Sequence, residues 1–332
     1  MIEKIRVSIG SASVLGLELI KLEVSPTTCY LMTFKSGKCS ANCGFCPQAR
    51  NSSSSIEKLS RVIWPAYSFK EFLTKLKILS PFKKFKRICI QTLNYPENFQ
   101  DLLEIVTQIK KISEIPMSVA IPPMTTDRLE RLKMKGVERV GIALDGSTQE
   151  VFDKIKGKEV EGPYKWETHF ECLKTALNIF GKRNVSTHII MGLGESEKEV
   201  LKLIEELDRL YILPGLFSFT PIKGTTLENL NQPSIINYRK IQLGRYLILF
   251  QKKTLNDFTY NSKDDIIKIN INKRELRNII DENIAFLTPG CPGCNRPFYT
   301  SRPSGPIFNF PRELTKEEKV EIYNTLQKYV NY

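Results

Sequence analysis

The sequence predicts an α/β protein built on a partial TIM-type barrel of six strand–helix units, (β/α)6, with N- and C-terminal extensions. Three observations predict this fold. Short β-branched runs alternate with amphipathic helical patterns through the middle of the 332-residue chain. The unit recurs six times, two short of the eight that close a barrel. Consecutive units of this kind are joined by right-handed crossovers, which place the strands parallel.

The elements follow from residue spacing. Strands are expected at 28–34, 87–93, 116–121, 139–144, 185–191 and 216–222, where β-branched and aromatic residues cluster. Helices are expected at 69–79, 99–112, 126–135, 165–180, 197–211 and 235–252, where apolar residues recur every three or four positions. Thr315 and Glu318 form a capping-box pattern that predicts a last helix ending near Val330. We therefore expect an N-terminal extension (1–27), a barrel (28–255) and a C-terminal extension (256–332).

The composition is that of a globular protein, with 41% hydrophobic and 26% charged residues. No apolar run approaches the roughly 18 residues of a membrane span. Acidic residues on both sides of the short apolar run near the N-terminus are unlike a signal peptide. We expect a cytoplasmic protein that does not enter a membrane.

The net charge of +13 comes from 49 basic and 36 acidic residues, and it has three interpretations. A Lys-rich composition explains it without any function. A basic face that docks an acidic partner protein is the second interpretation. Nucleic acid is the third, but no basic segment interleaved with aromatic residues supports it.

Three closely spaced cysteines, Cys39, Cys43 and Cys46, form the most informative motif. Their spacings of four and three residues suit three corners of a [4Fe–4S] cube, which normally takes four cysteines. One iron would therefore stay open to bind another molecule. Five of the eight cysteines are tightly clustered, which favours metal binding in a reducing compartment over disulfides.

This CxxxCxxC run, with Phe45 just before its last cysteine, resembles the signature of the radical S-adenosylmethionine (SAM) superfamily. The resemblance implies that Cys39, Cys43 and Cys46 hold a [4Fe–4S] cluster whose open iron chelates SAM. It implies a 5′-deoxyadenosyl radical that takes hydrogen from an unactivated carbon, with Phe45 beside the adenine. The superfamily uses a partial barrel with the cluster loop after the first strand, where the loop lies here.

Further SAM contacts are implied at three strand ends. Asp145 follows the fourth strand and resembles the aspartate of biotin synthase that binds the ribose; a turn or capping role is the alternative. Gly192 and Gly194 resemble the family's glycine-rich turn near the adenine, although an ordinary strand-to-helix turn has the same sequence. Pro221 and Ile222 resemble the segment whose backbone touches the adenine.

The second strand matches the family least well. Many members have Gly-Gly-Glu for the SAM amino group there, whereas this chain has Gln91 and Thr92, then Asn94 after Leu93. We take Gln91 and Asn94 as the candidate SAM contacts, with Ser118 on the third strand as a further polar candidate. His188 on the fifth strand either faces the cavity or is a hydrogen-bonded core histidine, and we expect the second.

A second cysteine site is predicted at Cys291 and Cys294, in a Pro- and Gly-containing CxxC loop. The alternatives are half of a zinc site, a redox dithiol, or a second, auxiliary [4Fe–4S] cluster. For the cluster, Cys29 on the first strand is the expected third ligand and Ser301 the expected fourth. The other hydroxyls considered are those of Thr300 and Ser304.

Biotin synthase places one ligand of its [2Fe–2S] cluster where Cys89 falls. Its other two cysteine positions correspond here to Ser118 and Ser186, so that cluster is not expected. Cys89 and Cys172 are then expected to be buried small apolar residues.

The tail after Cys291, CPGCNRP followed by SRPSG, resembles that of the two-component lipoyl synthases of archaea. The resemblance implies sulfur insertion at C6 or C8 of an octanoyl-lysine on a lipoyl carrier protein, with the auxiliary cluster as sulfur source. It also implies a homologous partner subunit and an electron donor such as ferredoxin. The alternatives are another radical SAM reaction, with the second cluster as electron relay, and a metal-stabilised basic binding protein.

Overall fold

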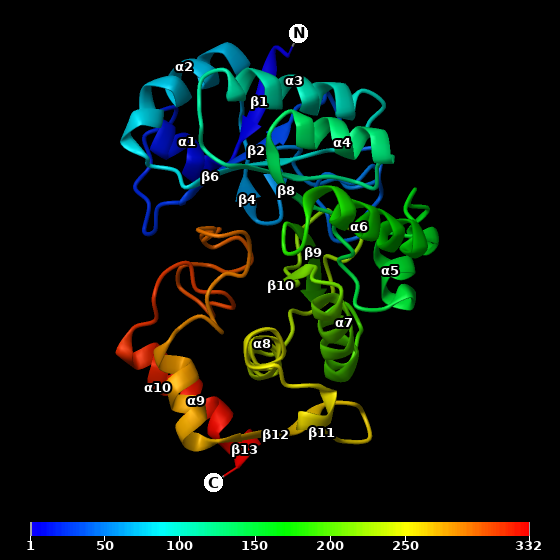
Figure 1. The fold of residues 1–332 in the computed structure, drawn as a ribbon, viewed down its shortest axis with the longest axis vertical. Coiled ribbons are helices and arrows are strands. Elements are labelled where there is room, and N and C mark those ends of the chain that lie inside the picture. Colours follow the sequence, from blue (N-terminus) through cyan, green and yellow to red (C-terminus); the bar gives the residue numbers. More distant parts are fainter. Residues whose placement is uncertain (1, 332) are drawn as a thin grey trace.

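A computed structural model of the chain describes residues 2–331. Six strands of the main sheet run parallel to one another, and two further strands, paired antiparallel, extend one edge (Figure 1). The strand order is β10 (Leu213–Ser218), β9 (Val185–Met191), β8 (Val137–Gly141), β7 (Met117–Ala120), β6 (Arg87–Gln91), β2 (Thr28–Thr33), β1 (Lys4–Val7) and β5 (Ala66–Ser68). The predicted α/β fold with an open, six-unit parallel sheet is confirmed.

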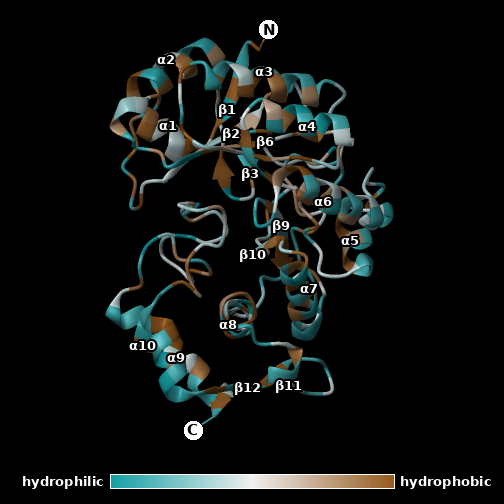
Figure 2. Cartoon of the chain, in the orientation of Figure 1, coloured by the Kyte–Doolittle hydropathy of each residue, from teal (hydrophilic) through white to brown (hydrophobic). Residues whose placement is uncertain are grey.

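Helices connect the parallel strands and cover their outer face. These are α2 (Phe69–Leu79), α3 (Asn98–Lys110), α4 (Thr126–Met134), α5 (Gln149–Ile155), α6 (Trp166–Phe180), α7 (Glu197–Arg209) and α8 (Ile235–Gln251), preceded by α1 (Ile9–Leu15). In Figure 2 the strands are largely brown, whereas the helices around them carry both brown and teal. This is the amphipathic pattern of helices that bury one face against a sheet.

The C-terminal part forms a small lobe beside α8 (Figure 1). It contains β11 (Phe258–Tyr260), β12 (Ile266–Asn272), α9 (Lys273–Asp281), α10 (Lys316–Leu326) and β13 (Val330–Asn331). The long loop between α9 and α10 reaches back toward the strands, in orange in Figure 1. In chain order, a β3–β4 hairpin (Lys58–Leu59 and Val62–Ile63) comes between β2 and β5.

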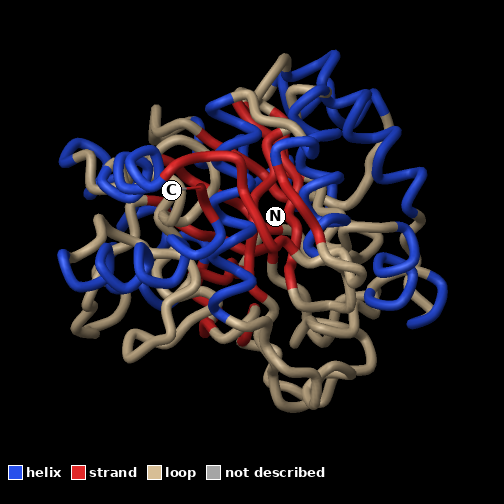
Figure 3. The backbone as a smooth tube through the Cα atoms, turned by 90° about the horizontal axis from the view of Figure 1, so that it is seen from below, coloured by secondary structure: helices blue, strands red, loops and turns tan. Residues whose placement is uncertain are grey.

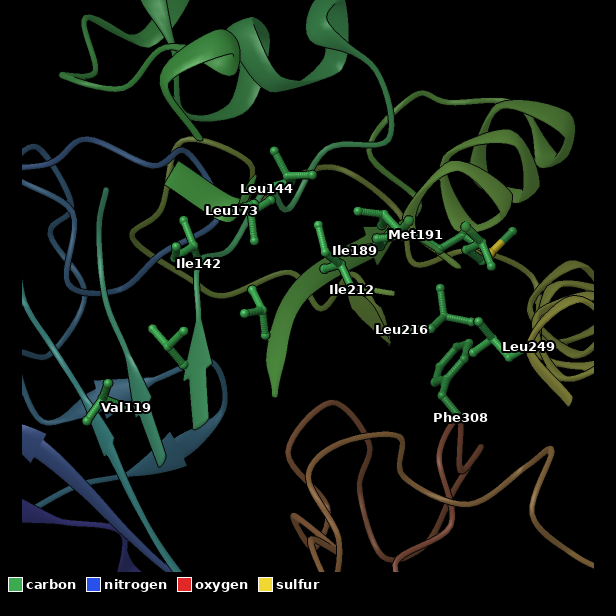
Figure 4. Packing of buried hydrophobic residues seen from close by; sticks show 14 of the residues in the cluster. Val119, Ile142, Leu144, Leu173, Ile189, Met191, Ile212, Leu216, Leu249 and Phe308 are labelled. Atoms are coloured by element: carbon green, nitrogen blue, oxygen red, sulfur yellow. The ribbon is translucent and has the colours of Figure 1, made fainter. Parts of the chain in front are cut away.

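The central sheet lies between helices and loops, as the view in Figure 3 shows. Its outer face packs against the helices in the largest apolar cluster. Figure 4 shows part of this cluster, where Leu144 lies near Leu173 of α6 and Phe308 of the C-terminal loop lies near Leu216 and Leu249. Phe308 therefore anchors the C-terminal loop to β10 and α8.

The two faces of β2 belong to different clusters. Tyr30 and Met32 lie in an inner cluster together with Cys39, whereas Cys29 and Leu31 lie in the outer core. Successive side chains of a strand point to opposite faces. This alternation decides below which cysteines meet.

Most predicted elements lie within a few residues of the observed ones. The sixth strand differs most from its predicted position: the sequence predicts 216–222, whereas the strand spans Leu213–Ser218. Thr220 leaves the sheet and its hydroxyl donates to the Thr300 carbonyl at 3.0 Å, so the C-terminal loop competes for this segment. The Thr315–Glu318 capping box is present at the start of α10. None of the helices within residues 2–331 is long and apolar enough to cross a membrane.

Candidate functional site

The three-cysteine loop follows β2 at the carboxyl ends of the parallel strands. Cys39, Cys43 and Cys46 all line one cavity there. Neighbouring loops fix the bend: Gly44 N donates to Ile155 O at 2.7 Å, and Asn94 N donates to the Cys39 sulfur at 3.1 Å. The cavity is also lined by Phe45, Gln91, Thr92, Asp145, Lys156, Tyr164 and His188.

The thiols of this loop are held in a dry setting. Burial, followed by the nearby Cys39 thiol, raises the pKa of Cys46 to about 12. Burial likewise raises the pKa of Cys43, which the Lys156 ammonium partly offsets. Iron binds the thiolate, so cluster assembly has to displace these protons.

The loop fits a cube better than it fits a single ion. Within residues 2–331, no three His, Cys, Asp or Glu side chains converge closely enough to hold one metal ion. In a [4Fe–4S] cube each cysteine binds a different iron, so its ligands stand further apart than ligands of one ion. Three thiols around one cavity, with no fourth cysteine lining it, match that donor set.

Asp145 and Lys156 form a buried ion pair in the same cavity. The Lys156 Nζ lies 2.7 Å from the Asp145 Oδ2 and 2.7 Å from the Ala143 carbonyl, which it donates to. Asp145 has a φ of 64°, and backbone hydrogen bonds to β9 hold it there: its N donates to His188 O, and its O accepts from Ile190 N. The predicted Asp145 therefore reaches the cavity together with Lys156, which the sequence had not indicated.

The second-strand candidates separate in the structure. Gln91 and Thr92 line the cysteine cavity, and the Thr92 hydroxyl donates to Ala120 O at 3.0 Å. Asn94 contributes its backbone N to the Cys39 sulfur, while the residue lines an adjoining cavity with Tyr164. Ser118 lies deeper, inside the barrel.

Hydrogen bonds within the Gly192–Glu195 turn hold its backbone in place. Gly192 and Gly194 have φ values of 103° and 113°, and the Glu195 carboxylate accepts from the Gly192 N at 2.5 Å and the Leu193 N at 3.0 Å. The glycines, together with Pro221 and Ile222, are not among the residues that line the cysteine cavity or the adjoining apolar cavity. Their adenine contacts stay a prediction.

An apolar cavity adjoins the cysteine cavity and shares Phe45, Cys46, Leu59, Gln91, Asp145 and His188 with it. The C-terminal loop closes its far side. The remaining apolar and aromatic residues around it are Pro47, Ile190, Phe217, Phe219 and Tyr299.

A third cavity lies inside the barrel and brings three other cysteines together: Cys89 of β6, and Cys291 and Cys294 of the C-terminal loop. Gln91 lines this cavity and both cavities above it, so it lies between the two groups of cysteines. His188 does the same, so it faces the cavities rather than the closed core in which it was expected.

Two expected ligands of the second site are not there. Cys29 is fully buried in the outer core, on the face of β2 opposite to Tyr30, and it does not line the cavity of Cys291 and Cys294. The Ser301 hydroxyl accepts from Phe308 N at 2.9 Å and is likewise absent from that lining. Strand alternation and this local hydrogen bond correct both expectations.

Residues 34–207, more than half of the chain, match the family model described as the Radical SAM superfamily. Biotin synthase of Methanococcus vannielii is 26% identical over 218 residues, covering 63% of this chain and 60% of that protein. Biotin synthase of Francisella tularensis subsp. holarctica (strain OSU18) is 28% identical over 210 residues, covering 60% of this chain and 61% of that protein. The chain thus spans about three fifths of these relatives.

Solved structures share the fold at low identity. Methylornithine synthase (PylB) superposes with a TM-score of 0.54 at 17% identity, covering 68% of this chain and 63% of that one. The FeFe-hydrogenase maturase HydG from Carboxydothermus hydrogenoformans gives a TM-score of 0.51 at 18% identity, covering 89% of this chain and 65% of that one. Together with the family match and the three-cysteine cavity, this fold assigns the chain to the radical SAM superfamily.

Proposed function

We propose that this protein is a radical SAM sulfurtransferase, which inserts sulfur into an unactivated C–H bond at C6 or C8 of an octanoyl-lysine on a lipoyl carrier protein. One observation carries the proposal: two groups of three cysteines face one barrel interior, on either side of Gln91. A hydrogen-abstracting site and a sulfur source have to share one interior for a carbon radical to meet sulfur.

The upper group, Cys39, Cys43 and Cys46, would hold the [4Fe–4S] cluster that the superfamily uses. When bound, that cluster would supply one electron, taken from a ferredoxin-type donor. This electron would split SAM into methionine and a 5′-deoxyadenosyl radical, and the radical would take a hydrogen atom from the substrate carbon. Phe45 offers an aromatic face toward the adenine from the border of the two upper cavities.

The Asp145–Lys156 pair would orient SAM. Lys156 uses only the Oδ2 oxygen of Asp145, which leaves Oδ1 to accept from a ribose hydroxyl. The Lys156 ammonium also lies 5.0 Å from the centre of the Tyr164 ring, which confines the side chain. Gln91 and Thr92 line the same cavity from β6 and its end and offer hydrogen-bonding groups to the amino-acid part of SAM.

The second group of cysteines, which includes Cys291 and Cys294 and lines the cavity inside the barrel, would hold the auxiliary cluster. When bound, that cluster would supply the sulfur that the substrate carbon takes up. The apolar cavity around Phe217 and Phe219 offers a lining for a hydrocarbon chain between the two groups.

The partners follow from charge and chemistry. With a net charge of +13, the chain is suited to bind an acidic carrier domain and an acidic ferredoxin. The resemblance of the tail to two-component lipoyl synthases supports a second, homologous subunit. Biotin-type sulfur insertion is the second candidate, because the relatives identified by sequence carry the name biotin synthase.

Mass spectrometry of the product tests the proposal. An octanoylated carrier peptide is incubated anaerobically with the reconstituted protein, SAM and a reductant, with and without a candidate partner subunit. The expected product gains one or two sulfur atoms, and each insertion consumes one SAM. The sulfur-free precursor of biotin serves as the competing substrate, and thiolation of that compound alone selects the second candidate.

A further inference from the structure

We propose that Cys89, Cys291 and Cys294, with the hydroxyl of Ser118, form the binding site of the second iron–sulfur cluster, with Arg296 as its counter-charge. This ligand set differs from the one the sequence predicts, in which Cys29 and Ser301 complete the site. The role of the cluster as sulfur source rests on the proposed function, whereas the site itself rests on the geometry below.

The register between β2, β6 and β7 places the side chain of Cys89 on the inner face of the sheet. Tyr30 of β2 pairs in register with Cys89 of β6, and Cys89 pairs with Ser118 of β7. Tyr30 and Cys89 belong to the inner apolar cluster, whereas Cys29 lies in the outer core. Cys89 and Ser118 therefore present a sulfur and a hydroxyl side by side on the inner face of the sheet.

The CxxC loop is fastened directly above that face. The Asn295 side chain accepts from Thr27 N at 3.0 Å and donates to Ser25 O at 2.9 Å. The backbone N of Arg296 donates to the Tyr30 hydroxyl at 2.8 Å. These bonds connect the loop to the start of β2, so the positions of Cys291 and Cys294 are fixed by the barrel itself.

Each of the three sulfur atoms contacts a polar side chain that lines the same cavity. The Cys291 Sγ lies 3.7 Å from the Ser118 Oγ, and the Cys294 Sγ lies 3.2 Å from the Tyr30 Oη. The Cys89 Sγ accepts from the Gln91 Nε2 at 3.1 Å.

Arg296 provides an independent indication of an anionic ligand. Its side chain lies among the rings of Tyr30, Phe217 and Tyr299, with the guanidinium carbon 4.5 Å from the centre of the Tyr299 ring. The residue is 9% exposed, and its Nε has no hydrogen-bond partner in the described part of the chain. None of the ion pairs in that part of the chain includes Arg296 either.

A buried cation without a carboxylate partner is costly unless another anion compensates it. An iron–sulfur cluster held by three thiolates is an anion of this kind, and Arg296 lines the same cavity as the three cysteines. Arg296 would offset that negative charge.

The site is separate from the SAM cluster, so it can be tested in its absence. In a Cys39→Ala/Cys43→Ala/Cys46→Ala background, the full chain is reconstituted anaerobically with iron and sulfide. Iron, sulfide and zinc are then measured per chain, and the Mössbauer spectrum identifies the cluster. We expect this background to keep one cluster, about half of the wild-type iron.

Cys89→Ala and Cys29→Ala in that background form a matched pair, because both residues are cysteines on adjacent strands. The proposal predicts that C89A loses the remaining cluster, while C29A keeps it. Ser118→Ala should keep iron but change the Mössbauer parameters of one site. Retention of the cluster in C89A, equal loss from C89A and C29A, or zinc in place of iron would overturn the assignment.

The ligand assignment and the proposed function fail in distinguishable ways. If C89A loses the cluster but the wild-type protein never thiolates the carrier peptide, the site stands and the sulfurtransferase proposal falls. If the wild-type protein thiolates the peptide while C89A keeps the remaining cluster, the function stands and this ligand set falls.

Discussion

Cys29 and Cys89 lie one register position apart on neighbouring strands, yet their thiols lie on opposite faces of the sheet. Cys29 is enclosed by the outer apolar core, whereas Cys89 shares a cavity with Cys291 and Cys294. A single step along a strand thus separates a packing residue from a candidate ligand. The same step separates the two ligand sets that the sequence and the structure support.

Replacing one ligand in each cysteine group should separate two activities. Cys43→Ala is expected to abolish SAM cleavage, because the cube would lose one of its three protein ligands. Cys291→Ala should spare cleavage and stop sulfur insertion. Chromatography of 5′-deoxyadenosine and mass spectrometry of the carrier peptide measure the two outcomes. Loss of cleavage in C291A would show that the second group supports SAM chemistry instead.

Removing one partner of the Asp145–Lys156 pair should cost more stability than removing both. Lys156→Met leaves a buried carboxylate unpaired, and we expect a loss of about 3–5 kcal/mol in the free energy of unfolding. Asp145→Asn/Lys156→Met should recover much of that loss, because neither partner is then charged. Urea denaturation of the apo protein provides the values. A double variant as unstable as K156M would contradict the account of the pair.

The cluster motif and the fold were predictable because both are local or periodic. Cys39, Cys43 and Cys46 lie within eight residues, and the helical stripes repeat along each helix. The phase of β2 was not predictable, since all six of its residues are buried and no polar alternation marks its inner face. The sequence therefore favoured Cys29 as a ligand and Cys89 as a buried apolar residue.

Contacts between distant segments were the other part that the sequence could not reveal. Lys156 follows a separate helix and reaches Asp145 only through the fold. Arg296 meets Tyr30 across 266 residues. The first strand, β1, was missed because its four residues fall in a segment read as an extension, although it pairs with β2.

The glycines after β9 should differ in how they tolerate a side chain. A Cβ at Gly192 would lie 2.7 Å from the Pro233 Cδ, whereas a Cβ at Gly194 would meet no atom within 4 Å. Both have a positive φ, so both alanine variants carry a backbone cost of about 1–3 kcal/mol. We expect Gly192→Ala to be the less stable of the two in thermal unfolding, and equal losses would remove Pro233 from the explanation.

Stability should fall in acid partly through His169. Burial, followed by the Lys156 charge, lowers its pKa to about 3, so the native state keeps it neutral. The unfolded state binds a proton below its usual pKa of about 6.5, which favours unfolding as the pH falls from there toward 3. The loss between pH 6.5 and 5 is up to about 2 kcal/mol. Urea denaturation of His169→Gln should show a shallower pH slope over that interval, and an unchanged slope would exclude this histidine as the cause.

Isotope transfer tests the central proposal of a sulfur source inside the barrel most directly. The protein is reconstituted with a heavy sulfur isotope as sulfide, separated from free sulfide, and given SAM, reductant and the octanoylated carrier peptide. We predict that the thiolated peptide carries the heavy isotope, and that the label is absent when C89A or C291A is used. Thiolated peptide without the label, or SAM turnover with no sulfur in any product, would contradict it.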